Sequence, residues 1–165
     1  MRFERRLTAD GQAAYANIEF RHATSEIRNP DGTIVFRAEN IEVPTQFSQV
    51  ATDILAQKYF RKAGVPAALK PVEENAVPSW LWRSEADTKA LAKLPEDQRY
   101  VGETSAKQVF DRLAGTWTYW GWKGGYFSDE SDAKTYFDEI RHMLCLLYTS
   151  PSPRDLSTSR MPSSA

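Results

Sequence analysis

Residues 44–66, PTQFSQVATDILAQKYFRKAGVP, constrain the fold of this chain more than any other stretch. Apolar residues recur there at helical spacing along two adjacent edges and form one broad stripe. The stripe consists of Phe47, Val50, Ile54, Ala51, Leu55 and Tyr59. A helix with so wide an apolar face has to pack against another part of the protein, so this stretch predicts a buried amphipathic helix.

The ends of this helix are marked by residues with known capping preferences. Thr45 or Ser48 can cap its start, because a hydroxyl accepts a hydrogen bond from a free backbone N–H. Gly64 stands where a left-handed residue commonly follows a helix, and Pro66 blocks continuation. We therefore expect the helix to reach the residues just before Gly64.

A β-hairpin is predicted on the amino-terminal side. Residues 29–32, NPDG, have turn chemistry: proline presets φ, aspartate bonds locally, and Gly32 accepts a positive φ. After the turn, Ile34, Phe36 and Ala38 alternate with other residues at the period of a half-buried strand. The segments RFERRLT and ANIEFRHAT are two further candidate strands.

Three more helices are expected in the second half. Ser84 is a candidate cap for a short helix that ends at Pro95, Ser105 with Gln108 matches a capping box, and Ser128 opens the last helix. The two longer helices have apolar stripes: Val109, Phe110, Leu113, Ala114 and Trp117 in the first, and Ala133, Tyr136, Phe137, Ile140 and Met143 in the second. The expected fold is α+β: a mostly helical layer with an amino-terminal β-hairpin or small antiparallel sheet, a disordered C-terminal tail, and faces that need a larger body to cover them.

Charge and composition exclude several classes of partner. The formal net charge of the 165 residues is -1, which gives no electrostatic footprint for nucleic acid or an anionic membrane. No apolar run is long enough to cross a membrane, and the charged start is unlike a secretory signal. A single cysteine fits a reducing cytoplasm. We expect a cytoplasmic protein without membrane or nucleic-acid partners.

The most unusual stretch is GTWTYWGWKGGYF, residues 115–127, which contains three of the five tryptophans. One reading is a stand-alone binding module in which segment 117–127 stacks on single-stranded nucleic acid. That reading needs interleaved basic residues, and only Lys123 is present, so aromatic packing at a helix end is favoured. Trp80 and Trp82 in PSWLWRS are likewise read as structural anchors of a loop in preference to a docking site.

No catalytic or metal-binding residue is predicted. The acids occur as adjacent pairs, such as Glu73-Glu74 and Asp138-Glu139, and neighbours in sequence do not face each other as an acid/base pair does. His22, His142 and Cys145 lack the spacing of metal ligands. The catalytic and metal sites are therefore assigned to none of these residues, and cofactor-binding residues stay unknown.

Four segments together resemble a known family: TSEIRNPDGTIVF, SQVATDILAQKYFRKAGVP, VPSWLWRS and GETSAKQVFDRLAGTWTYWGWKGGYF. They are similar to the amino-terminal region of bacterial vitamin B12-dependent (class II) ribonucleotide reductases, and the resemblance runs nearly continuously over residues 1–144. It divides the chain into 1–144, an amino-terminal domain of such an enzyme, and 145–165, a tail that does not follow the family pattern.

The resemblance implies a radical enzyme that makes 2′-deoxyribonucleotides from ribonucleotides for DNA synthesis. In the family, adenosylcobalamin supplies a deoxyadenosyl radical, a cysteine in a ten-stranded α/β barrel forms a thiyl radical, and a thioredoxin-type partner re-reduces a cysteine pair. The resemblance places all of these residues in the barrel, beyond the region present here. It implies that this region is a scaffold for the barrel, is inactive alone and binds no cofactor by itself.

The tail from Cys145 to Ala165 has a separate explanation in the genetic code. Cys145–Asp155 back-translates to a string that resembles the reverse complement of a transposon-based sequencing adapter, and Ser159–Ala165 to the flow-cell end of that adapter. The three residues between them fall where a variable index lies. We interpret the tail as an adapter translated in frame. The alternative is a disordered Ser/Pro linker with Cys145 as an exposed thiol.

Overall fold

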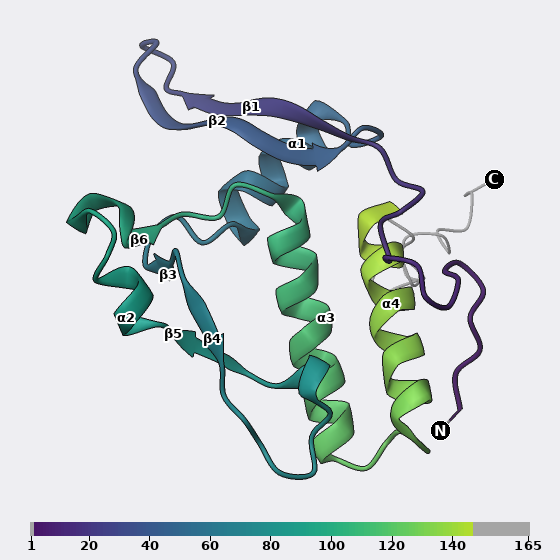
Figure 1. The fold of residues 1–165 in the computed structure, drawn as a ribbon. Coiled ribbons are helices and arrows are strands. Elements are labelled where there is room, and N and C mark those ends of the chain that lie inside the picture. The colour runs from purple at the N-terminus through teal and green to yellow at the C-terminus, as the bar shows by residue number, and fades with distance from the viewer. Residues whose placement is uncertain (1, 147–165) are drawn as a thin grey trace, which may run out of the picture.

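The computed structural model describes residues 2–146 (Figure 1). The tail was predicted to be disordered, and its residues from 147 on lie outside the described range. Within it, a β-hairpin and a short helix lie across one end of two long helices, with short strands beside them (Figure 1). This arrangement confirms the predicted α+β fold with an amino-terminal hairpin.

The hairpin pairs β1 (Phe20–Arg28) with β2 (Ile34–Pro44) in antiparallel fashion. Its turn forms as predicted, because the Asp31 carboxylate accepts the Thr33 backbone N–H at 2.9 Å and Gly32 has a φ of 86°. The candidate strand in ANIEFRHAT is confirmed as the start of β1. The other candidate, RFERRLT, is wrong, because no strand forms there and the segment lies on a helix instead.

Helix α1 (Gln49–Ile54) begins as predicted but ends early. The Ser48 hydroxyl accepts the Ala51 N–H at 3.2 Å, which selects Ser48 over Thr45 as the cap. A π-turn, Leu55–Tyr59, follows directly, and the Phe60 N–H donates to the carbonyl of the first residue of that turn at 3.1 Å. The predicted extension to Gly64 is therefore wrong, although Gly64 does have a positive φ of 76°.

The early end of α1 is explained by a buried carboxylate. Glu103, whose side chain is 0% exposed, accepts the Arg61 backbone N–H at 2.8 Å and Arg61 Nε at 2.9 Å. It also accepts Arg112 Nε at 3.1 Å and Nη2 at 3.0 Å. We call these three residues the Glu103 cluster. It binds the Arg61 N–H outside the helix, so the chain leaves the helical path at Phe60.

Gly102 allows the backbone of this cluster to come close. A Cβ atom at position 102 would lie 2.8 Å from the Lys62 carbonyl oxygen, closer than real Cβ contacts allow. Burial raises the pKa of the Glu103 carboxyl, but the hydrogen bonds from Arg112 and Arg61 outweigh burial and hold its pKa below the usual value. The carboxylate is therefore charged and fully bonded.

Short elements fill the region between the π-turn and the long helices. These are β3 (Val65–Pro66) paired with β6 (Tyr100–Val101), β4 (Leu69–Pro71) paired with β5 (Ser84–Ala86), 3₁₀ turns at Ser79–Leu81 and Glu96–Gln98, and α2 (Thr88–Leu91). Ser84 lies in β5, so its predicted capping role is wrong. Asp87 caps α2 instead, because its carboxylate reaches two free N–H groups of the first turn.

The long helices are α3 (Ala106–Lys123) and α4 (Glu130–Leu146), which run side by side in opposite directions (Figure 1). The predicted capping box of α3 is confirmed, with both Ser105 and Gln108 in place. Helix α4 continues two residues beyond Leu144, where the family resemblance was expected to stop, because the side chain of Cys145 is buried in the core.

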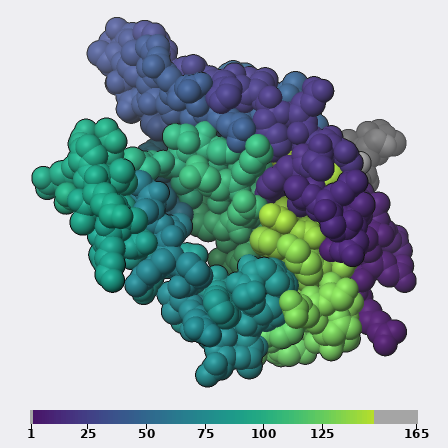
Figure 2. All heavy atoms as spheres, viewed as in Figure 1, coloured from purple at the N-terminus to yellow at the C-terminus, as the bar shows by residue number. Residues whose placement is uncertain are grey.

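The amino-terminal segment lies along α4 (Figure 2). Arg5 forms an ion pair with the buried Asp138 at 2.9 Å, and Glu139 accepts the Thr8 N–H at 2.8 Å and its hydroxyl at 2.7 Å. These contacts explain why the segment is not a strand: the α4 carboxylates bind its N–H groups in place of another strand.

The hydrophobic core joins the hairpin to α1, α3 and the end of α4. Its buried members are Ile41, Val43, Phe47, Leu55, Ala56, Phe60, Ala106, Val109, Phe110 and Cys145. Because these residues come from the hairpin, from α1 and the π-turn, and from both long helices, the hairpin and the helices form one packed unit.

Replacing Glu103 by glutamine tests the importance of the Glu103 cluster. We expect the free energy of unfolding to fall by about 2–3 kcal/mol, because two arginines lose a buried charged partner. The Glu85→Gln variant is the matched control: Glu85 pairs with Lys70 at the surface, and its loss should leave stability unchanged within error. Urea denaturation of both variants measures the difference.

The pH dependence of the Glu103→Gln effect has a defined sign. Because the pKa of Glu103 is lowered in the folded state, its contribution is present above the unfolded carboxyl pKa of about 4.3. It is lost as the pH falls through the folded-state value. A glutamine variant as stable as the original chain at pH 7 would contradict the assigned role.

Candidate functional site

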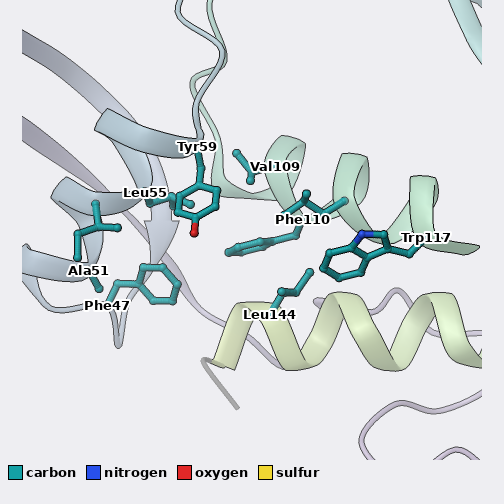
Figure 3. A pocket seen from close by; sticks show the side chains of 10 residues that line it. Phe47, Ala51, Leu55, Tyr59, Val109, Phe110, Trp117 and Leu144 are labelled. Carbon is teal, nitrogen blue, oxygen red and sulfur yellow. The ribbon is translucent and has the colours of Figure 1, made fainter. Parts of the chain in front are cut away.

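An apolar groove of about 500 Å³ lies where α1 and the π-turn meet α3 and the end of α4 (Figure 3). Its lining residues are Phe47, Ala51, Ile54, Leu55, Tyr59, Val109, Phe110, Leu113, Trp117 and Leu144. Figure 3 shows Trp117 and Leu144 facing each other from α3 and α4, with Tyr59 on the opposite side. The groove is therefore formed by segments from three separate parts of the sequence.

The π-turn determines which aromatic ring faces the groove. The extra residue in the turn buries Phe60 in the core at 7% exposure and leaves Tyr59 at the groove with 52% exposure. Arg112 Nη2 donates to the Tyr59 carbonyl at 3.0 Å, which fixes the backbone at this point. A π-turn inside a helix often marks a functional position, and here it shapes one wall of the groove.

The chemistry of the lining favours an apolar occupant. Of the lining side chains, Tyr59 and Trp117 alone have a polar atom, a hydroxyl and an indole N–H. Small-molecule sites usually combine apolar walls with several convergent polar groups. The groove has no lining side chain that could hold a phosphate or a metal ion.

The tryptophan-rich segment forms the second half of α3 and the turn that follows it, and its tryptophan rings have different neighbours. Trp117 lines the groove, Trp122 donates to the Ala76 carbonyl at 2.7 Å, and Trp120 is 63% exposed. Lys123, the basic residue on which stacking on nucleic acid would depend, forms an ion pair with Glu74 at 2.8 Å. The structure gives no support to a stacking platform and favours the packing interpretation.

Trp80 and Trp82 have the structural role that was favoured. Trp80 Nε1 donates to Glu130 at 2.8 Å, and its ring lies 5.7 Å from that of Phe137 in α4. Trp82 Nε1 donates to the Val77 carbonyl at 2.8 Å within its own loop. Together these contacts hold the loop before β5 against the long helices.

The acidic residues singled out in the sequence take part in structural contacts. Glu74 accepts the Tyr119 hydroxyl at 2.9 Å as well as pairing with Lys123, and Asp138 lies between Arg5 and Arg141. Hydrogen bonds from Lys123 and Tyr119 lower the pKa of the Glu74 carboxyl. These carboxylates are ion-pair partners of basic residues within the domain.

The two histidines and the cysteine occupy different environments. His142 is buried, with Nδ1 2.9 Å from the Ala14 carbonyl oxygen, whereas His22 lies opposite Glu42 in the hairpin. Cys145 is 0% exposed, and burial raises the pKa of its thiol to about 12. The alternative interpretation of the tail as a disordered linker predicted an exposed Cys145 thiol, and the burial of this thiol contradicts it. Among residues 2–146, no group of three or more His, Cys, Asp or Glu side chains is placed to hold a metal ion.

Sequence reasoning did not predict the groove itself. It identified most of the apolar residues as helix faces in need of a partner, but it placed those of residues 47–59 on one continuous helix. The missed signal is the width of the stripe in residues 47–59, which is greater than one neighbouring helix can cover. None of the helices described is long and apolar enough to cross a membrane.

The fold and the groove define a small α+β packing domain with ion pairs that join its segments and an apolar groove open at its surface. Comparison with known proteins identifies the family of this domain. The amino-terminal model of the family described as class II vitamin B12-dependent ribonucleotide reductase matches residues 21–146. The chain belongs to this family.

Individual relatives agree with the family match. The chain is 64% identical over 159 residues to a vitamin B12-dependent ribonucleotide reductase of Bradyrhizobium diazoefficiens, and 65% identical over 159 residues to one of Agrobacterium fabrum. Each match covers 96% of this chain but only 13% and 12% of the relative. A more distant relative, from Rhodopirellula baltica, is 24% identical over 131 residues, which cover 79% of this chain and 10% of the relative. The chain thus spans about an eighth of the length of its two more similar relatives.

Thiol labelling tests the burial of Cys145. In native buffer at pH 8 we expect an alkylating reagent to modify this thiol very slowly, because burial both blocks access and keeps the thiol protonated. In denaturant the same chain should react completely within minutes. Labelling in native buffer as fast as that of free cysteine would contradict the position of Cys145 in the core.

Proposed function

We propose that this chain is the amino-terminal region of an adenosylcobalamin-dependent ribonucleotide reductase, in which it acts as a scaffold for the catalytic barrel. The observation that supports this most strongly is the family match over residues 21–146. The described residues are consistent with a scaffold, because several of their charged groups form ion pairs within the domain and an apolar groove lies open at its surface. The whole enzyme would act on ribonucleotides in the cytoplasm, with a thioredoxin-type protein as reductant.

The lining of the apolar groove does not fit the cofactor itself. Cobalamin has amide side chains and a phosphate, which need hydrogen-bonding partners when they are buried. The groove offers one hydroxyl and one indole N–H among apolar side chains. We therefore assign no cobalamin-binding, substrate-binding or catalytic role to any residue of this chain, and place those roles in the rest of the polypeptide.

Activity measurements test the scaffold role. The chain alone, supplied with adenosylcobalamin, a dithiol and a ribonucleotide, should form no deoxyribonucleotide above the level without cobalamin. Residues 1–144 joined to the remainder of the Bradyrhizobium diazoefficiens relative should restore nucleotide reduction, because the two proteins are 64% identical in this region. Turnover by the chain alone, or a folded but inactive chimera, would contradict the proposal.

We also propose that the tail from Cys145 onward is a translated sequencing adapter. The family model ends at residue 146, which supports a boundary near this position, whereas the pairwise matches take in part of the tail. Amplifying the source DNA across codon 144 decides the matter. We expect a genomic product whose reading frame continues with a different sequence, and a product that encodes the same tail would overturn the adapter origin.

A further inference from the structure

The apolar groove is open although its residues are of the kind that proteins bury. Ile54 is 51% exposed, Tyr59 52% and Trp117 38%, and Val50 on the next turn of α1 is 67% exposed. Exposed apolar surface of this kind, grouped around a hollow, marks a site of contact with another polypeptide segment. The groove is therefore a surface that has a partner in the whole protein.

The walls of the groove are fixed before anything binds. The Glu103 cluster fixes the chain after the π-turn, and Arg112 binds the Tyr59 carbonyl at 3.0 Å. At the floor, the rings of Phe47 and Phe110 pack with their centroids 6.3 Å apart. A preformed groove binds its occupant without the cost of ordering its own side chains, so it is suited to a permanent contact.

The position of α4 indicates which segment the groove receives. Leu144 in α4 forms one wall, so the polypeptide that follows this residue in the full-length enzyme begins beside the groove. The similar relatives are about eight times as long as the matched region. A segment attached at this point has an effective concentration in the millimolar range, about what a short flexible linker gives, far above that of a separate molecule.

From these observations we infer that, in the full-length enzyme, the segment that directly follows α4 folds back and fills this groove with apolar side chains. The inference rests on the proposed function, and it adds to it by naming the surface and the occupant through which the domain meets the rest of the polypeptide. Backbone carbonyls of the incoming segment are the natural acceptors for the Tyr59 hydroxyl and the Trp117 indole N–H, because buried donors need partners.

Cysteine protection measures whether the groove is covered. Ile54→Cys reports on the groove, and Val35→Cys, at a position 60% exposed in the hairpin, is the matched control. Both are labelled with a maleimide in the 165-residue chain and in the chimera with the Bradyrhizobium diazoefficiens relative, and peptide mapping identifies each site. In the chimera we expect Ile54→Cys to react at least about tenfold more slowly than in the chain alone, while Val35→Cys reacts at an unchanged rate.

Photo-crosslinking identifies the occupant. With Tyr59 replaced by p-benzoylphenylalanine in the chimera, we expect crosslinks to residues that directly follow α4. Crosslinks to a distant part of the polypeptide would overturn the inference, and so would crosslinks between two chimeras or labelling of Ile54→Cys that slows as the concentration of the isolated chain rises. Both of the latter would indicate a second copy as occupant.

The two proposals fail in different ways. A chimera that reduces nucleotides while Ile54→Cys reacts as fast as in the chain alone would overturn the groove inference and leave the scaffold role standing. A chimera that protects Ile54→Cys but reduces no nucleotide would support the groove contact and contradict the proposed function.

Discussion

The buried carboxylate of Glu103 is the interaction on which the rest of the structure depends. It binds Arg61 just after the π-turn and Arg112 in α3, so it joins two segments that lie on opposite sides of a loop of about forty residues. Because Arg112 also holds the Tyr59 carbonyl, the same cluster determines where the turn ends and how Tyr59 lies. A buried charged group thus shapes the apolar groove that the domain presents.

Aromatic side chains also join segments distant in sequence, at the other end of the long helices. Trp80 and Trp122 use their indole N–H groups to hold the loop before β5 against α4 and α3, and Tyr119 binds Glu74 in the same loop. An indole contributes both a large apolar area and a directed hydrogen bond. Three of the five tryptophans, Trp80, Trp82 and Trp122, therefore fix a long irregular loop, whereas Trp117 lines the groove and Trp120 is exposed.

Local chemistry was sufficient to predict much of the fold. The NPDG turn, the Ser48 cap, the capping box of Ser105 and Gln108, and the stripes of α3 and α4 all depend on residues a few positions apart. The end of α1 could not be predicted in this way, because the group that competes for the Arg61 N–H is Glu103, distant in sequence. Likewise, Ser84 has the residue type of a helix cap, but its segment pairs with β4 and forms a strand.

The apolar character of the candidate site could be predicted from the sequence, but its shape could not. Helical spacing showed that residues 47–59 needed an apolar partner, and the groove does consist of such residues. Its outline depends on the π-turn and on Leu144 arriving from the far end of the described chain, which no short window of sequence contains. The family resemblance indicated the class of enzyme to which the chain is related, but it gave no geometry for this surface.

The contacts of the amino-terminal segment with α4 have a consequence for how the protein is made. Phe3, Arg5 and Thr8 bind Asp132, Asp138 and Glu139, residues more than 125 positions later in the chain. During synthesis this segment remains without its α4 partners until α4 has left the ribosome, and contacts of such long range slow folding. Of the described residues, those translated earliest are thus among the last to reach their final position, and they do so only when the helix beside the groove has formed.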